Sequence, residues 1–220
     1  MPLVVDHDER RNLIATVVKR IVATEGMDAV TIRHVARQAG FKSAVISHYF
    51  KDKREMLNFT LESIRKLAAE RVETGFQDHL DLGACFEHLL CIEEDSVLDW
   101  QVWFGFWGKT TFDPELANIR ARIVEATHDY LERVLEGAKQ RGGLPTTLDC
   151  GIHARRLQMV FNGIAALAVI NPDAWPPEAQ RAVLGVELTL MKTMPTFELG
   201  HVPTSELAVA GSSSQTERNP

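Results

Sequence analysis

The chain has 220 residues, 45% of them hydrophobic, and carries a formal net charge of −6. It is long enough to bury a sizeable core as one large or two small domains. Its three cysteines, Cys85, Cys91 and Cys150, include no CxxC or Cys/His pair at metal spacing, so neither a disulfide framework nor a zinc or other metal site is indicated. The N-terminus lacks the pattern of a secretory signal, and no stretch reaches the ~18–20 apolar residues of a membrane span. We therefore expect a cytoplasmic protein without a membrane partner.

The first predicted helix covers about Glu9–Thr24, after a short lead at residues 1–8. Its apolar residues recur at helical spacing and form an inward stripe of Leu13, Ile14, Val17, Val18, Ile21 and Val22. Gly26 is expected to stop it. This helix is long enough to pack behind the segments that follow.

Residues 31–54 predict a helix-turn-helix, in which two short amphipathic helices are joined by a turn at residues 40–42. Thr31 is placed to cap the first helix, and Gly40 can adopt the left-handed conformation that ends it. In the second helix Val45, Ile46, Tyr49 and Phe50 form the inner stripe. Ser43, Ser47 and His48 lie on the outer side, which would face DNA.

Charge supports this prediction. Residues 31–54 contain six basic residues and one acidic residue, a net charge of +5. Residues 1–70 carry +3 and residues 71–220 carry −9. A run of basic residues more often marks a solvated surface, but here the turn, the cap and the apolar period agree with DNA binding. An acidic second part does not hold DNA, so we expect it to serve in dimerisation and sensing.

The helix-turn-helix residues resemble the TetR family of transcriptional repressors, through Thr31-Ile32-Arg33, Val35–Phe41, Ile46–Phe50 and Lys51-Asp52-Lys53 followed by Glu55-Met56-Leu57. The resemblance implies an all-α fold, in which an N-terminal three-helix helix-turn-helix module is joined by a long helix to a C-terminal helical domain for ligand binding and dimerisation. We place the DNA-binding domain at 1–54, the effector-binding and dimerisation domain at 55–195, and a disordered tail at 196–220. The implied function is a repressor that binds a pseudo-palindromic operator in double-stranded DNA as a homodimer and is released by a small-molecule effector.

Ten residues are candidates for contacting DNA: Thr31, Arg33, Lys42, Ser43, Ala44, Val45, Ser47, His48, Tyr49 and Lys53. Arg33 can bond bidentately to the O6 and N7 edge of guanine, or it can clamp a phosphate. The family resemblance implies phosphate contacts for Thr31 and Lys53. Val45 also belongs to the apolar stripe, and Tyr49 is equally well explained as a core aromatic residue.

The fourth predicted helix begins at Asp52 with the pattern of a capping box, Glu55 standing three residues later, and extends to about Gly75. Five more helices are expected at about Leu82–Glu93, Ser96–Lys109, Pro114–Gln140, Thr147–Ile170 and Pro177–Met194.

The most informative segment of the second part is DWQVWFGFW, at residues 99–107. On a helix its aromatic residues Trp100, Trp103, Phe104 and Trp107 lie on one face, which favours a ligand-binding pocket; an aromatic stripe at this spacing is more often core. Acidic residues at 93–95 and 99 stand just upstream, and tryptophan faces attract cations. The segment also resembles the choline-responsive, BetI-type branch of the family. This resemblance implies a small effector, cationic or apolar, whose identity stays open.

The last two helices have the apolar content of an interface, with Leu157, Phe161, Ile164, Leu184, Leu188 and Met191 as candidates. In the family the corresponding pair meets its symmetry mate as a four-helix bundle. The core of a single chain produces a similar pattern, so the dimer rests on the resemblance.

Two alternatives stay open at this point. The protein can be a constitutive DNA-binding dimer whose aromatic face is only core, or its C-terminal domain can be an enzyme. No nucleophile–base spacing, glycine-rich phosphate loop or metal motif supports the enzyme, and we expect neither catalysis nor a cofactor.

Overall fold

The computed structural model of the chain describes residues 7–77, 79, 81–110 and 113–196. The regular secondary structure of this part consists of helices, and the all-α prediction is confirmed. The elements in chain order are α1 (His7–Glu25), the 3-10 turn η1 (Met27–Ala29), α2 (Ile32–Gln38), α3 (Ser43–Tyr49), α4 (Lys53–Gln77), α5 (Leu82–Glu87), α6 (Glu94–Thr110), α7 (Pro114–Gln140), α8 (Cys150–Ile170) and α9 (Pro177–Thr193).

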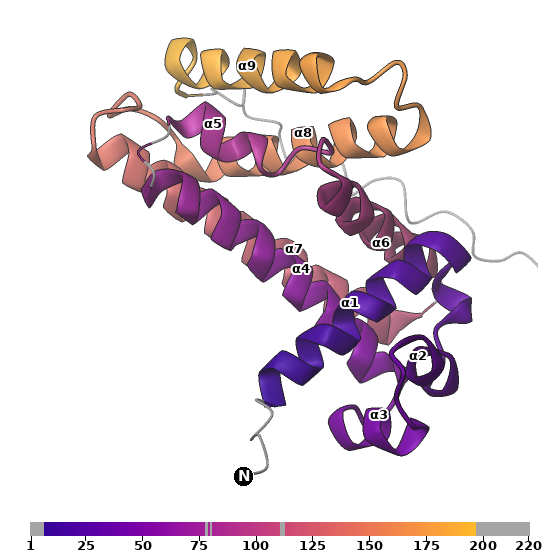
Figure 1. Ribbon diagram of the computed structural model, residues 1–220. Helices are drawn as coiled ribbons and strands as arrows, with labels where there is room; N and C mark the ends of the chain where they lie inside the picture. Colours follow the sequence, from indigo (N-terminus) through magenta and orange to yellow (C-terminus); the bar gives the residue numbers. More distant parts are fainter. Residues whose placement is uncertain (1–6, 78, 80, 111–112, 197–220) are drawn as a thin grey trace, which may run out of the picture.

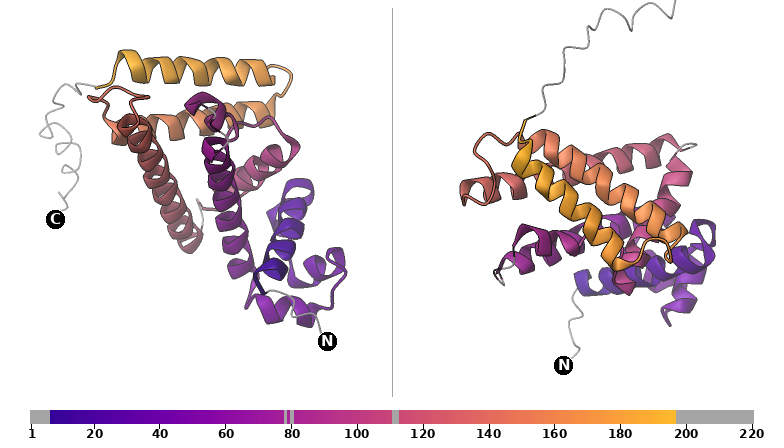
Figure 2. Two further views of the ribbon diagram at one scale, coloured as in Figure 1. Left: turned by 60° about the vertical axis from the view of Figure 1, so that its left-hand side comes forward. Right: turned by 90° about the horizontal axis from the view of Figure 1, so that it is seen from above.

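The helices are arranged between two distant ends of the molecule (Figure 1). One end holds α2 and α3, with α1 packed across α4 beside them. The long helices α4 and α7 run towards the other end, where α8 and α9 lie side by side (Figure 2). Helix α6 lies against both α1 and α8, and so connects the two ends.

The N-terminal module has the predicted caps. The Thr31 hydroxyl accepts a hydrogen bond from the His34 N–H at 3.1 Å, and Gly40 has a φ of 70°. The Phe41 N–H then donates to the Ala36 carbonyl at 2.8 Å, closing the end of α2. These short-range bonds set the tight turn between α2 and α3.

The predicted cap of α4 is also present. The Glu55 N–H donates to the Asp52 carboxylate at 2.8 Å. The return bond differs from the usual capping box, because the Glu55 carboxylate accepts from the Lys51 N–H at 2.8 Å instead of from the cap residue. Helix α4 therefore starts where expected and extends for 25 residues.

The hydrophobic core continues across the domain boundary expected at residue 54. The cluster that holds α1, α2, α3 and the first half of α4 also contains Val102 and Phe106 of α6, and Leu116 and Ile123 of α7. Helices α1 and α6 approach closely at Gly105, where an added Cβ atom would lie 3.3 Å from Val22 Cγ1. The N-terminal module is thus packed directly on helices of the second part.

Two predicted helix boundaries are wrong. The helix expected at 82–93 ends at Glu87, since the N–H groups of Leu89 and Leu90 bond to carbonyls three residues back, as in a turn. The backbone of Cys91 is then held by Gln180 of α9, whose side chain accepts from the Cys91 N–H at 3.0 Å and donates to its carbonyl at 2.9 Å. Helix α8 begins at Cys150 instead of Thr147, because Asp149 caps it by accepting from the Ile152 N–H.

Of the tail expected at 196–220, residues 197–220 lie outside the described residues.

Replacing Phe86 by alanine should lower the free energy of unfolding by about 3–5 kcal/mol, because its fully buried ring packs edge-on against Phe161. Leu67→Ala is the control, since Leu67 is 49% exposed, and it should change stability by about 0.5 kcal/mol or less. Urea unfolding at one protein concentration measures both. Equal losses in the two variants would contradict the assignment of Phe86 to the core.

Candidate DNA-binding surface and ligand pocket

The candidate DNA contacts lie together on α2, α3 and the turn between them. Most of them are exposed, namely Thr31, Arg33, Lys42, Ser43, Ala44, Ser47 and His48. Val45 and Tyr49 are half-buried. Tyr49 packs against the hydrophobic cluster formed by α1, α2, α3 and the first half of α4, and its ring also contacts His48. Tyr49 therefore combines a core position with one at the edge of this surface.

Basic residues of α2 and of the turn before α3 are exposed at this surface. Arg33, Arg37 and Lys42 are exposed, whereas the ion pairs of the module use other cations, such as Arg11 with Glu55 at 3.0 Å. Positive charge on a protruding pair of short helices is what a phosphate backbone attracts.

Lys53 has a structural partner that the sequence did not indicate. Its ammonium group donates to the Met27 carbonyl of η1 at 2.8 Å. Burial lowers the pKa of Lys53, and nearby Asp28 opposes this shift. An ammonium group has further N–H donors, so the phosphate contact stays a prediction.

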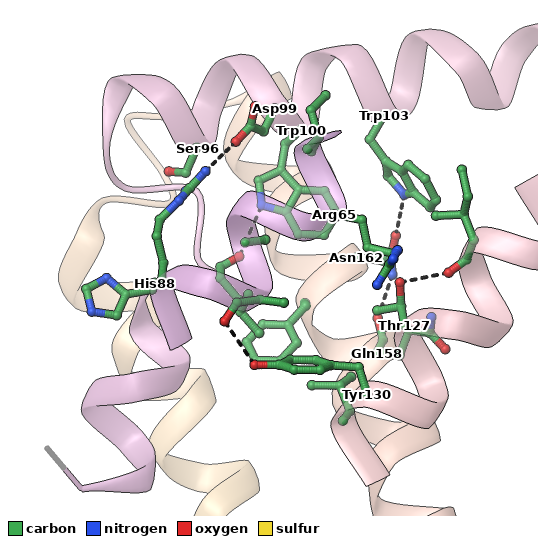
Figure 3. Close-up of a pocket in the computed structure, with 18 of the residues that line it drawn as sticks. Arg65, His88, Ser96, Asp99, Trp100, Trp103, Thr127, Tyr130, Gln158 and Asn162 are labelled. Atoms are coloured by element: carbon green, nitrogen blue, oxygen red, sulfur yellow. Dashed lines mark hydrogen bonds and ion pairs between the residues drawn. The ribbon is translucent and has the colours of Figure 1, made fainter. Parts of the chain in front are cut away.

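A cavity of about 130 Å³ lies between α4, α6, α7 and α8 (Figure 3). Its walls are mainly apolar and aromatic, which is typical of small-molecule sites. The lining residues are Leu61, Ile64, Arg65, Ala68, Ala69, Arg71, His88, Leu89, Ser96, Asp99, Trp100, Trp103, Ile123, Thr127, Tyr130, Leu131, Gln158, Phe161 and Asn162.

The predicted aromatic face is divided between pocket and core. Trp100 and Trp103 line the cavity. Phe104 instead packs in a small cluster with Cys91, Ala165 and Ala168. The Trp107 ring lies outside the lining as well, with the Arg120 guanidinium 4.2 Å from its centre. The pocket assignment for Phe104 and Trp107 is therefore wrong for this cavity. Residues 100–107 extend over about two turns of α6, so their four rings do not all reach the same cavity.

Asp99, the last of the acidic residues upstream of the tryptophans, lies in the cavity wall and is buried. Its carboxylate accepts from Lys19 of α1 at 2.8 Å and from Arg71 of α4 at 2.7 Å. A buried charge is tolerated when it is paired in this way. This one carboxylate thus links the N-terminal helix, the long connecting helix and the pocket wall.

Several pocket residues come from helices other than α6 and were not predicted from the sequence. Asn162 of α8 accepts a hydrogen bond from the Trp103 indole N–H at 3.1 Å (Figure 3). Gln158 donates to the Val124 carbonyl at 2.8 Å. These two polar residues stand four apart within the apolar stripe of α8, a spacing that could have signalled a polar site on the buried face. No comparable sequence signal marks Arg65 or Tyr130.

Tyr130 of α7 closes one side of the cavity, where its hydroxyl donates to the Ala69 carbonyl at 3.1 Å. Burial, with a smaller effect of the Glu73 charge, raises the pKa of Tyr130 to about 12. The phenol is therefore a neutral hydrogen-bond donor at physiological pH.

The predicted dimer residues lie mainly inside one chain. Leu157, Phe161, Ile164, Leu184 and Met191 are 0–4% exposed, and Leu188 is half-buried against the same core cluster. We therefore correct this assignment, because side chains so deeply buried in one chain have almost no surface left for a partner. The same two helices expose other apolar residues, namely Met159, Leu167, Ile170, Val183 and Val186.

One group in the described part of the chain combines residue types that bind metals, namely His128, Asp129 and Glu132 of α7, with ligand atoms within 4.8 Å of one another. All three come from one helix, and His128 and Glu132 face each other at 3.7 Å. This arrangement is an ordinary i,i+4 pair and gives no reason to assign a metal.

None of the described helices has the length and apolarity required to cross a bilayer.

Two family models match the chain. Residues 18–58 match the model of bacterial regulatory proteins of the TetR family, and residues 81–191 match the C-terminal domain of BetI-type transcriptional repressors. The chain is therefore a transcriptional regulator of the helix-turn-helix class. It belongs to the TetR family, with a C-terminal domain of the BetI type.

Individual relatives agree with this assignment. The chain is 29% identical over 214 residues to the HTH-type transcriptional regulator BetI of Serratia proteamaculans, covering 92% of this chain and 100% of that protein. It is 26% identical over 180 residues to the regulator PksA of Bacillus subtilis, covering 78% and 84%.

Solved structures share the fold. A transcriptional regulator from Rhodococcus sp. Rha1 superposes with a TM-score of 0.69 and 23% identity, over 85% of this chain and 98% of that one. A proposed regulator from Saccharomonospora viridis, solved in complex with choline, gives a TM-score of 0.66 and 20% identity, over 84% and 96%.

The phenol of Tyr130 should ionise near pH 12 in the folded protein, instead of near the usual 10. Because the folded state favours the neutral phenol, this group stabilises the fold fully below pH 10, and the contribution is lost as the pH rises towards 12. Absorbance at 295 nm during an alkaline titration reports the step, and Tyr130→Phe should remove it. A step near pH 10 that disappears in Tyr130→Phe would contradict the buried position.

Proposed function

We propose that this regulator is a homodimeric repressor, released from its operator when a small molecule enters the cavity beside Trp100 and Trp103. One observation carries the proposal, namely that the cavity wall contains Asp99, which is bonded to Lys19 of the N-terminal module. The choline complex of the Saccharomonospora viridis protein supports a small-molecule site in this kind of domain. Its place of action would be the cytoplasm, where an operator is accessible.

The DNA-reading element in this proposal is α3, placed in the major groove. Lys42 and Thr31, at the starts of α3 and α2, would hold phosphates, together with Lys53. Arg33, Ser43, Ala44, Val45 and Ser47 would lie near base edges, where small side chains permit close approach, with His48 and Tyr49 beside the backbone.

For the dimer we propose the exposed apolar faces of α8 and α9. Ile170 is 79% exposed, Val186 61% and Leu167 46%. Clusters of exposed apolar side chains mark interaction surfaces. The two helices lie at the end opposite α2 and α3 (Figure 2), so a two-fold axis there would leave both α3 helices free for two operator half-sites.

Release would proceed through α4 and α6. A ligand between Trp100, Trp103 and Arg71 changes the surroundings of Asp99, and Asp99 holds Lys19 of α1. A shift of these helices alters the separation of the two α3 helices. A coupling of about 1–3 kcal/mol between the two sites would lower operator affinity about 5–150-fold.

The repressor assignment is tested by binding to DNA from the region upstream of its own gene, at two salt concentrations. Tight, sequence-dependent and salt-sensitive binding is expected, and compounds can then be screened for release. If every genomic fragment binds no better than random DNA, the operator hypothesis fails. If binding is specific but no compound that occupies the cavity releases it, the protein acts as a constitutive regulator.

Lys42→Ala should weaken binding to all DNA sequences and flatten its salt dependence. Loss of one phosphate contact in each subunit should reduce the slope of log K against log salt by about 1.8 per dimer, from about 0.9 per contact. Lys66→Ala is the matched control, because Lys66 is exposed on α4, away from α2 and α3. An unchanged slope in Lys42→Ala would exclude the phosphate role.

Val186→Asp should raise the dissociation constant of the dimer at least about tenfold, because the dimer would then bury two unpaired charges near its axis. Analytical ultracentrifugation over a concentration series measures this constant. Leu67→Asp, which also adds a charge at an exposed leucine but lies on α4, should leave it unchanged. Dimerisation of Val186→Asp at wild-type strength would place the interface elsewhere.

A further inference from the structure

The cavity offers a ligand little apart from apolar contact. Its walls include Leu61, Ile64 and Leu89 and the rings of Trp100, Trp103 and Phe161. Most of the polar groups around it are already bonded within the protein. A ligand is therefore held mainly by burial of its own apolar surface, and its polar part has to match the few groups that remain.

The indole N–H groups are among the groups already used. Trp100 donates to the Leu89 carbonyl at 3.1 Å, and Trp103 donates to Asn162 at 3.1 Å. The Asn162 amide donates to the Gln158 carbonyl at 2.6 Å, and Tyr130 donates to Ala69. The N–H groups of Trp100 and Trp103 and the O–H of Tyr130 are therefore in use, and a ligand that needs one of these donors must first break a bond of the protein.

The carboxylate in the cavity is not available to a cation. Asp99 already accepts from two cations, Lys19 at 2.8 Å and Arg71 at 2.7 Å. An ammonium ligand would add a third cation to this one carboxylate, or displace one of the two cations that it already holds. The lining also contains two arginines, Arg65 and Arg71, against this single acid, so its formal charge is positive.

Among the lining groups that keep free hydrogen-bonding atoms, which include His88 and the side-chain oxygen of Gln158, Arg65 carries a permanent charge. Its Nε atom donates to Glu62 at 3.1 Å, which fixes the plane of the guanidinium. Within the part of the chain that the structure describes, its two terminal nitrogens have no hydrogen-bond partner. The side chain is 25% exposed, and it lies beside Trp100, Asn162 and Gln158 (Figure 3). A guanidinium held in this way matches a planar anionic group such as a carboxylate.

We infer that the effector is an apolar, ring-sized or chain-like molecule that carries a carboxylate, with its apolar body against Trp100 and Trp103 and its carboxylate on the terminal nitrogens of Arg65. This inference rests on the proposed use of the cavity as the effector site, and it names the chemistry of that ligand. Of the two kinds of effector that the BetI-type resemblance implies, cationic or apolar, it excludes the cationic one. The difference follows from the pairing of Asp99 and from the position of Arg65.

Three probes of matched shape test the inference: 4-phenylbutyrate, 4-phenyl-1-butanol and (4-phenylbutyl)trimethylammonium. Quenching of tryptophan fluorescence and isothermal titration calorimetry on the full chain give their dissociation constants. The acid should bind at least about tenfold more tightly than the alcohol, since hydrogen bonds to charged groups are stronger than neutral ones. The ammonium compound should bind more weakly than the alcohol.

Arg65→Gln should remove the preference for the acid and leave the affinity for the alcohol unchanged. Lys66→Gln is the control for the change in charge, because Lys66 is the adjacent, exposed residue of α4 and is absent from the lining. It should keep the preference of the wild-type protein. A preference that survives in Arg65→Gln would overturn the assignment of this residue.

The outcomes separate this inference from the proposed function. Equal or tighter binding of the alcohol or the ammonium compound, with release of the operator, overturns the carboxylate inference and supports the effector-responsive repressor. An Arg65-dependent preference for the acid without any change in operator binding supports the carboxylate chemistry of the cavity's ligand, and it contradicts regulation through the cavity. Failure of all three probes to bind overturns the inference.

Discussion

The paired carboxylate of Asp99 is the interaction on which the arrangement of the helices depends. A buried charge needs its counter-charges, and Asp99 takes them from Lys19 of α1 and Arg71 of α4. Loss of either partner would leave the buried Asp99 carboxylate with only one counter-charge. The two ion pairs therefore fix α1, α4 and α6 relative to one another, at the edge of the cavity.

The remaining contacts between the N-terminal module and the second part reinforce this junction. Gly105 lets α6 approach Val22 of α1, and Lys109 of α6 pairs with Asp28 at 2.7 Å. Arg54 pairs with Asp113 at 3.3 Å and with Glu115, both at the start of α7. These exposed pairs contribute little stability individually. They do hold α6 against η1 and the start of α7 against the start of α4, close to the helix-turn-helix. In the proposed mechanism, a change in the packing of α6 would alter the orientation of α3.

The charges of the two ends serve different proposed partners. The exposed basic residues of α2 and α3 suit a phosphate backbone, whereas the cavity keeps its acid neutralised and leaves a guanidinium available. The inferred carboxylate ligand would differ from the choline of the Saccharomonospora viridis protein, and a shared fold does not by itself carry a ligand from one protein to another.

The sequence by itself determined the helix-turn-helix, the caps at Thr31 and Asp52 and the all-helical class, because caps, turns and helical periodicity act within a few residues. Tertiary structure decided which apolar residues face inward. Leu157 and Val186 look alike in an apolar stripe, but only packing buries the first and exposes the second. It also ended α5 early, through Gln180, which lies 89 residues from Cys91. The pocket likewise joins Arg65, Trp103 and Asn162 from three helices, because its geometry depends on contacts that no local pattern encodes.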